Sequence, residues 1–337
     1  MPFTYPLTYV LTAVCAAAEV KSKPVISTDV NVLGVTSVGD RLFVLLNQQS
    51  NQVAVYYIDC YRPQPEIDLP DLKPHVCNDI VACVPARRLF VSDYLGCAIH
   101  RYDLADCVPT RWSTGGCPRS VSVTACGNLL VTFWHKSADK HLVEISAESG
   151  LSMREIALPP EIEYPAHALQ LAAGPLLVCL SVPTPTQTGY SANVIAGSAS
   201  GKSTPKGYGA SGYFTRPSSV HHRVYAVDGF SQVHPVYPSG DGVHCSGVPR
   251  CPFYLAADNE SQSVFVAETA SRRADPADGD DDDDADTGRL AVLRGPRMQF
   301  VRYISERLAR PTRLHFDQAR RRLYVVVKDR DIFVLQL

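Results

Sequence analysis

The sequence predicts an all-β fold, a six-bladed β-propeller built from four-stranded antiparallel blades. A short apolar phrase that ends in Val recurs along the chain. The copies are spaced by roughly 40 to 50 residues, the period expected for one propeller blade per repeat. No stretch has apolar residues repeated at helical spacing over several turns, so the pattern does not predict helical repeats.

Six copies of the phrase give six blades. They are Arg41-Leu42-Phe43-Val44, Arg88-Leu89-Phe90-Val91, Asn128-Leu129-Leu130-Val131, Pro175-Leu176-Leu177-Val178, Ser263-Val264-Phe265-Val266 and Arg322-Leu323-Tyr324-Val325. The steps between their first apolar residues are 47, 40, 47, 88 and 59. We attribute the two long steps to insertions within a blade, at 183–220 (rich in Ser, Thr, Gly, Pro and Ala) and at 275–287 (acidic). The whole chain, 1–337, is then a single domain.

Individual strands can be placed in the clearest repeats, because short β-branched and aromatic runs are bounded by turn residues. In the second repeat we expect strands at Asp79–Cys83, Leu89–Ser92 and Ala98–Asp103, with a turn at Val84–Arg87. In the sixth we expect Arg313–Phe316, Leu323–Val327 and Ile332–Leu335, with a turn at Asp317–Arg320.

The sixth blade has room for only three strands before Leu337. Its fourth strand is expected from the residues that precede blade one, which begins near Asn31. The candidates are Thr8–Val14 and Glu19–Ile26. Such closure pairs the two ends of the chain and removes an exposed sheet edge.

The second repeat resembles the repeat of six-bladed propellers of the NHL and YVTN type. The resemblance rests on Leu89-Phe90-Val91-Ser92-Asp93 and on Cys97-Ala98-Ile99-His100-Arg101-Tyr102-Asp103. The resemblance concerns the pattern of strands in a repeat, and it extends over most of residues 30–337. It implies a platform for binding protein or RNA, although some relatives are hydrolases or lyases. Fold alone does not choose among these activities.

Composition is that of an ordinary soluble protein, with 45% hydrophobic residues, a formal net charge of −2 and a pI near 6.5. There is no basic excess to neutralise phosphates, so nucleic acid is not the expected partner. We expect a monomer that binds a protein. The arginines of the last blade are expected to be solvated turn residues, with a basic face as the alternative: Arg307, Arg310, Arg313, Arg320, Arg321 and Arg322.

Two features bear on the cellular compartment. Leu7 to Ala18 resembles the apolar core of a signal peptide, but no Lys or Arg precedes it, and it is too short to span a membrane. Asn259-Glu260-Ser261 is a glycosylation sequon on an expected turn. We favour the cytoplasm, with secretion as the alternative.

The chain has eleven cysteines. Cys83, Cys126 and Cys179 are expected to pack as small apolar side chains. In an oxidising compartment, Cys107 with Cys117, or Cys245 with Cys251, could close small loops.

No cofactor site is expected. Residues 196–203, Ala-Gly-Ser-Ala-Ser-Gly-Lys-Ser, fit a relaxed phosphate-loop pattern, but Pro205 prevents the helix that such a loop requires. The acidic run Asp280 to Asp284 lacks the ligand spacing of a calcium loop. The densest group of other possible metal ligands does not have zinc spacing either: His221, His222, His234, His244, Cys245 and Cys251.

No catalytic residue is nominated. The Gly-x-Ser-x-Gly motif of serine hydrolases is missing. Nothing in the spacing of Asp93, Asp258 or Glu268 separates them from ordinary strand-end residues. We therefore expect a non-catalytic binding scaffold for a protein partner. The alternative is a metal-dependent hydrolase of the lactonase-like kind, which would bring three or more acidic or amide side chains together in the central channel.

Overall fold

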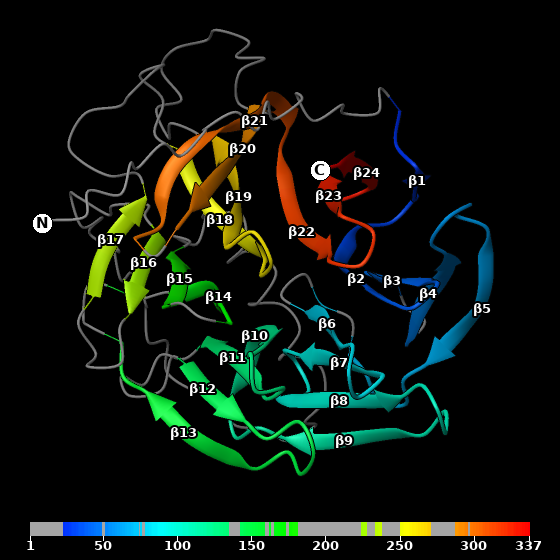
Figure 1. Cartoon of the computed structure of the whole chain (residues 1–337). Coiled ribbons are helices and arrows are strands. Elements are labelled where there is room, and N and C mark those ends of the chain that lie inside the picture. Colours follow the sequence, from blue (N-terminus) through cyan, green and yellow to red (C-terminus); the bar gives the residue numbers. More distant parts are fainter. Residues whose placement is uncertain are drawn as a thin grey trace, which may run out of the picture.

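A computed structural model describes residues 23–48, 51–73, 75, 78–134, 142–158, 162, 165–172, 175–180, 224–227, 233–237, 250–270, 287–295 and 297–337. These residues form 24 strands and no helix. The strands make six four-stranded antiparallel sheets arranged as blades around a central axis (Figure 1). The six-bladed all-β fold predicted from the sequence is confirmed.

The first three blades follow one another regularly. Blade 1 contains β2 (Val32–Val38), β3 (Arg41–Leu46), β4 (Gln52–Tyr57) and β5 (Pro63–Asp68). Blade 2 contains β6 (Asp79–Cys83), β7 (Arg88–Asp93), β8 (Ala98–Asp103) and β9 (Pro109–Ser113). Blade 3 contains β10 (Cys117–Val123), β11 (Leu129–Trp134), β12 (Leu142–Ile145) and β13 (Ser152–Ile156).

The other three blades complete the ring. Blade 4 contains β14 (Pro165–Gln170), β15 (Leu176–Leu180), β16 (Val224–Val227) and β17 (Val233–Tyr237). Blade 5 contains β18 (Arg250–Asp258), β19 (Ser263–Ala270), β20 (Thr287–Arg294) and β21 (Gln299–Ala309). Blade 6 contains β22 (Pro311–Asp317), β23 (Arg322–Val327), β24 (Asp331–Gln336) and, as its outer strand, β1 (Ile26–Ser27).

The predicted closure by an N-terminal strand is confirmed. In β1, Ile26 pairs with Ile332 and Ser27 with Asp331 of β24 (Figure 1). The strand is short and begins where the candidate Glu19–Ile26 ends, while Thr8–Val14 lies outside the described residues. Blade 6 thus combines β1, from the N-terminal part of the chain, with the three C-terminal strands.

The recurring phrase marks the second strand of each blade, whose apolar residues are packed on both faces. Phe43, Phe90 and Val131, for example, are fully buried between neighbouring blades. The expected turn at Val84–Arg87 is present, and strands β6 and β8 coincide with their predicted bounds. The core therefore lies between the blades.

Antiparallel strands give the disc two distinct faces. One face, here called the loop face, holds the connections from the second to the third strand of each blade. It also holds the connections from the fourth strand of one blade to the first strand of the next. The other connections leave on the opposite face, here called the turn face. Between the described strands, no turn-face connection exceeds 6 residues. The four longest loop-face connections are 69–78, 181–223, 238–249 and 271–286.

Both insertions fall in loop-face connections. Residues 183–220 lie between β15 and β16 of blade 4, and residues 275–287 lie between β19 and the start of β20 in blade 5. Apart from Thr287, both lie outside the described residues. A search of the described residues for a membrane-spanning helix finds none.

Candidate functional site: the central ring

The innermost strands of five blades are irregular near their first residues. In blades 1, 3, 4, 5 and 6 a bulge shifts the register of the first strand against the second. In the last four of these blades the residue before the bulge is a proline: Pro118, Pro165, Pro252 and Pro311. Proline has no N–H to donate and is tolerated at such positions, and a bulge re-aims the side chains that follow it.

One position of the first strand is equivalent in all six blades, and in the five blades with a bulge it directly follows the bulge. At this position each residue pairs with the residue that directly follows the closing Val of the recurring phrase, as Asp79 pairs with Ser92 and Tyr254 with Ala267. We call this set the central ring: Gly34, Asp79, Ser120, His167, Tyr254 and Arg313. Each ring residue lies on the innermost strand of its blade, three or four residues before the turn-face end of that strand.

The Asp79 carboxylate is the hub of the ring. The hydroxyl of Tyr254 lies 2.9 Å from each carboxylate oxygen and donates to them from the opposite side of the disc. The backbone N–H groups of Ile80 and Val121 donate at 2.9 and 3.2 Å. Burial raises the pKa of Asp79 to about 6, while the charge of Arg313 and these hydrogen bonds act in the other direction. The carboxylate therefore bridges blades 2, 3 and 5.

Tyr254 and His167 are the two aromatic residues of the ring, and their side chains contact each other. Their ring centroids lie 3.9 Å apart, and both side chains are buried. Burial and the nearby Asp79 charge raise the pKa of Tyr254 well above its ordinary value, so that it stays a hydrogen-bond donor. Burial, reinforced by the charge of Arg313, lowers the pKa of His167 to about 3. The imidazole is therefore neutral at physiological pH.

Arg313 is the cation of the ring and joins blade 6 to its neighbours. Its Nε donates to the Leu33 carbonyl of blade 1 at 2.6 Å, and its Nη1 donates to the Thr312 carbonyl at 2.9 Å. Its guanidinium carbon lies 5.4 Å from the Tyr254 ring centroid, within cation–π distance. Arg313 was expected to be a solvated turn residue, and this expectation was wrong because its strand faces the channel.

Gly34 is the one ring position without a side chain, and its neighbours explain this. A Cβ atom there would lie 2.8 Å from Ile80 Cγ2, 2.9 Å from the Ile80 nitrogen and 3.0 Å from Asp79 Oδ1. Those separations are shorter than van der Waals contact. The missing Cβ gives blades 1 and 2 room to approach and leaves space for the Asp79 carboxylate.

The ring is chemically suited to holding the blades together. Divalent cations prefer several oxygen ligands, whereas the ring presents one carboxylate with an arginine nearby. Among the described residues there is no group of three His, Cys, Asp or Glu side chains that could hold a metal ion. The Ser120 hydroxyl is paired within its own blade, 2.8 Å from the Thr132 hydroxyl.

A serine, a histidine and an aspartate also meet where blade 6 contacts blade 1. Ser37 Oγ lies 2.7 Å from His315 Nε2 and donates to Asp317 Oδ2 at 3.3 Å. In a catalytic triad the carboxylate orients the imidazole, and the hydroxyl bonds the imidazole alone. Here the carboxylate accepts from the hydroxyl itself, and Ser37 is buried. The arrangement joins blade 6 to blade 1 through three polar side chains.

The three acids considered from the sequence lie away from the central ring. Asp93 is buried at the loop-face end of β7, where it accepts from the Gly96 N–H at 2.7 Å and contacts His100 at 3.2 Å. Glu268 is buried on the second strand of blade 5. Asp258 lies at the turn-face end of β18.

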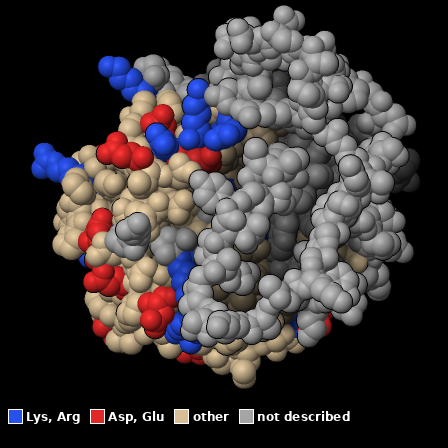
Figure 2. Space-filling model, turned by 180° about the vertical axis from the view of Figure 1, so that it is seen from behind, with Lys and Arg blue, Asp and Glu red and all other residues tan. Residues whose placement is uncertain are grey.

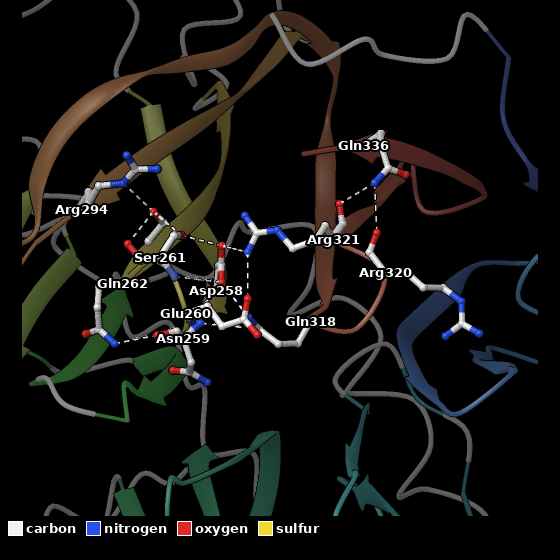
Figure 3. A network of polar contacts seen from close by, with 11 residues as sticks. Asp258, Asn259, Glu260, Ser261, Gln262, Arg294, Gln318, Arg320, Arg321 and Gln336 are labelled. Atoms are coloured by element: carbon white, nitrogen blue, oxygen red, sulfur yellow. Dashed lines mark hydrogen bonds and ion pairs between the residues drawn. The ribbon is translucent and has the colours of Figure 1, made fainter. Parts of the chain in front are cut away.

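Asp258 organises a polar network between blades 5 and 6 (Figure 3). It accepts from Ser261 at 2.5 Å, from Gln318 at 2.9 Å and from Arg321 at 2.6 Å. Although burial acts in the opposite direction, the hydrogen bonds from Ser261 and Gln318 hold the pKa of Asp258 below its ordinary value. The glycosylation sequon lies in this same turn, with Asn259 exposed.

Other arginines of the last blade are also paired. Arg320 donates to the Gly39 carbonyl at 2.6 Å, Arg322 contacts Asp59 at 3.1 Å and Arg310 contacts Asp329 at 2.7 Å. The Arg307 side chain lies outside the described residues. On the face shown in Figure 2, the described Lys and Arg residues are interspersed with Asp and Glu. Arg320 and Arg322 thus join blade 6 to blade 1, whereas Arg310 pairs with the β23–β24 connection of blade 6 itself.

The structure changes the account of the cysteines. Cys83 and Cys179 are buried, as expected, whereas Cys126 is exposed because β10 ends before it, at Val123. Cys117 contacts Cys97 rather than Cys107. The remaining candidates from the sequence have side chains outside the described residues: Ala196 to Ser203, His221, His222, His234, His244, Cys245, Cys251 and Asp280 to Asp284.

The central ring was not predicted from the sequence, although the chain contains a signal for it. The ring position lies eight to ten residues before the first apolar residue of each phrase, as with Gly34 and Leu42 or Asp79 and Leu89. In four blades a proline stands two residues before it, as Pro165 precedes His167. Aligning the phrases and reading backwards to these prolines would have found four of the six positions.

The buried imidazole of His167 should make the free energy of unfolding depend on pH. The unfolded chain takes up a proton near the ordinary pKa of 6.5, whereas the folded chain does so only near 3. The stability that neutral His167 contributes is therefore present above about pH 6.5 and is lost as the pH falls. Asp79 acts oppositely, because its raised pKa favours folding most below about pH 4.

Urea titrations of the unmodified chain and of His167→Gln at several pH values would isolate the contribution of His167 to the free energy of unfolding. The stability advantage of the unmodified chain is expected to shrink by about 1.4 kcal/mol per pH unit between about pH 6 and 4. A difference that stays constant over this range would contradict the neutral, buried state of His167.

Comparisons with known proteins show the fold. No family model matches the chain, and no curated protein matches its sequence. A protein provisionally described as a gluconolactonase is similar in structure, with a TM-score of 0.57, 11% identity, and coverage of 95% of this chain and 92% of that one. Hydrazine synthase from Kuenenia stuttgartiensis gives a TM-score of 0.54, 11% identity, and coverage of 93% and 97%.

A third similar structure is the β-propeller domain of Cps50 (Swd1) from Myceliophteria thermophila. Its TM-score is 0.51 at 12% identity, with 91% of this chain and 83% of that chain covered. These three proteins have different descriptions, and their identities to this chain are low. The similarity therefore establishes the propeller fold and transfers no residue roles.

Proposed function

We propose that this chain is a non-catalytic scaffold that binds a protein partner on its loop face, with blades of the NHL-like repeat type. The observation that carries the proposal is the asymmetry of the disc. Between the described strands, turn-face connections have at most 6 residues, whereas the loop-face connection between β15 and β16 covers 181–223. Binding residues concentrate on long connections held by a rigid framework.

The central ring supports a scaffold rather than an enzyme. Its hub, Asp79, accepts from Tyr254 across the channel and from the backbone of blades 2 and 3. These groups are buried and bonded to one another, so they are committed to holding the blades in place. A rigid disc is what a binding surface on its face requires, because preorganisation lowers the entropic cost of association.

Charge favours a protein partner over nucleic acid. The formal net charge is −2, and acidic and basic side chains alternate on the face shown in Figure 2. Binding to phosphates requires a basic surface that releases counterions. A partner with both apolar and polar groups suits this surface better.

The metal-dependent hydrolase remains the second candidate function. It would need three or more acidic or amide ligands in the channel, and the described central ring supplies the single carboxylate of Asp79. The likeness to the protein described as a gluconolactonase is one of fold. We therefore rank this function below the scaffold.

Two exposed apolar residues of blade 2 provide a matched test of the binding face. Leu95 is 45% exposed in the β7–β8 turn on the loop face, and Val108 is 53% exposed in the β8–β9 connection on the turn face. Affinity capture from the source cells with the unmodified chain identifies the partner. Leu95→Asp is expected to reduce its capture at least tenfold, whereas Val108→Asp should leave capture unchanged.

The two variants change similar exposed side chains to the same acid, so general effects of charge or stability should appear in both. Melting temperatures of both variants confirm that they are folded. If Val108→Asp abolishes capture while Leu95→Asp does not, the partner binds the turn face and the proposal is wrong.

A further inference from the structure

Two cysteines from neighbouring blades meet at the loop face. Cys97 ends the turn between β7 and β8 of blade 2, and Cys117 is the first residue of β10 in blade 3. Their sulfur atoms lie 3.1 Å apart, and both residues are partly buried. Of the seven cysteines whose side chains the structure describes, these two have sulfur atoms in contact.

We propose that Cys97 and Cys117 are an oxidation site that forms a disulfide and staples blade 2 to blade 3. A disulfide bond is about 2.05 Å long, so the sulfur atoms need to approach by about 1 Å. Side-chain rotation can supply such a movement without rearranging the strands. The bond would close residues 97–117, a segment that contains all of β8 and β9.

The backbone around Cys97 is already held in place. The Gly96 N–H donates to Asp93 at 2.7 Å, and the Gly96 carbonyl accepts from Arg111 at 2.6 Å. The Cys97 carbonyl accepts from the Thr114 N–H at 3.0 Å, and Thr114 begins the short connection that leads to Cys117. These bonds fix the two thiol-bearing segments to each other, which reduces the entropy lost when the disulfide forms.

The conformation of Cys97 is also unusual for a residue with a side chain. Its φ is +48°, in the left-handed region that glycine adopts most easily. Its thiol approaches the Tyr94 carbonyl at 3.8 Å and the Cys117 sulfur more closely. A cysteine here directs its sulfur at the neighbouring blade, where glycine would have none.

The chemistry balances with a small-molecule disulfide as oxidant. One protein thiolate attacks oxidised glutathione, which forms a mixed disulfide and releases one glutathione thiolate. The second protein thiolate then attacks the protein sulfur of the mixed disulfide and releases the other glutathione. The protein pair loses two electrons and two protons, and two glutathione thiols are produced. Excess reduced thiol reverses the reaction.

Tryptic peptide mapping can identify the bond, because cleavage after Arg88, Arg101, Arg111 and Arg119 places the relevant cysteines in separate peptides. Cys97 falls in 89–101, Cys107 in 102–111 and Cys117 in 112–119. The full chain is incubated with oxidised glutathione, remaining thiols are alkylated, and the digest is analysed without reductant. The expected species joins 89–101 to 112–119 and disappears on reduction.

Stability gives a second readout. Closing a loop of this size is expected to raise the melting temperature of the oxidised chain by about 5 °C. Cys97→Ser and Cys117→Ser should each abolish the linked peptide and the increase, whereas Cys107→Ser should retain both. If Cys117 links to Cys107 instead, or if no linked peptide forms while the thiols remain accessible to alkylation, the proposal is overturned.

Discussion

Replacing Arg313 with methionine is expected to lower the free energy of unfolding by about 3 to 5 kcal/mol, because the change leaves the buried Asp79 carboxylate without its nearby cation. It also removes the donors to the carbonyls of Leu33 and Thr312. Methionine retains much of the volume of the side chain, so that loss of charge and hydrogen bonds dominates over loss of packing. Equilibrium unfolding in urea at pH 7 measures the change.

Arg154→Met is the matched control. Arg154 pairs with Glu144 at 2.6 Å, but its side chain is 59% exposed, so the loss should be below about 1 kcal/mol. Asp79→Asn in the Arg313→Met background should recover part of the stability, since it removes the uncompensated charge. Additive effects of the two substitutions would show that Asp79 and Arg313 do not interact.

Deleting residues 1–28 is expected to lower the melting temperature by roughly 10 °C, since it removes the outer strand of blade 6. The deletion eliminates Ile26, which is 7% exposed and packs near Ile332 and Val334. It also removes the hydrogen bonds from Val25 to Ile332 and from Thr28 to Arg330. Differential scanning calorimetry measures the shift.

A deletion of residues 1–20 keeps the whole of β1 and serves as the control, so its melting temperature should stay close to that of the full chain. Ile26→Asp in the full chain should reproduce a large part of the loss. An unchanged melting temperature in the 1–28 deletion would show that β1 does not close the propeller.

The fold was predictable because the second strand of each blade is covered on both faces. Burial on both sides selects an uninterrupted apolar phrase, such as Leu89-Phe90-Val91, and such a phrase is visible in a single sequence. Blade 2 showed the resemblance to known repeats best. Its strands pair without a single register shift, so the sequence follows the regular pattern of a four-stranded sheet.

The central ring was not predictable from the same pattern, because each blade contributes one residue of a different kind. Asp79 and Tyr254 are 175 positions apart in the chain, and their contact depends on blades 2 and 5 facing each other across the disc. Gly34 gives no chemical signal at all, since its role is to lack a side chain. Contacts that depend on ring closure appear only once the number of blades and the bulges are known.

The central ring holds the blades together, and we propose that the loop face binds the partner. Titration calorimetry with the captured partner separates these two roles, using the unmodified chain, Leu95→Asp and Tyr254→Phe at a temperature where all three are folded. Tyr254→Phe removes the hydroxyl that bonds Asp79 across the channel. Tyr254→Phe should lower the melting temperature but leave the affinity for the partner unchanged, whereas Leu95→Asp should weaken that affinity at least tenfold. Loss of affinity in folded Tyr254→Phe, with normal affinity in Leu95→Asp, would instead make the channel the binding site.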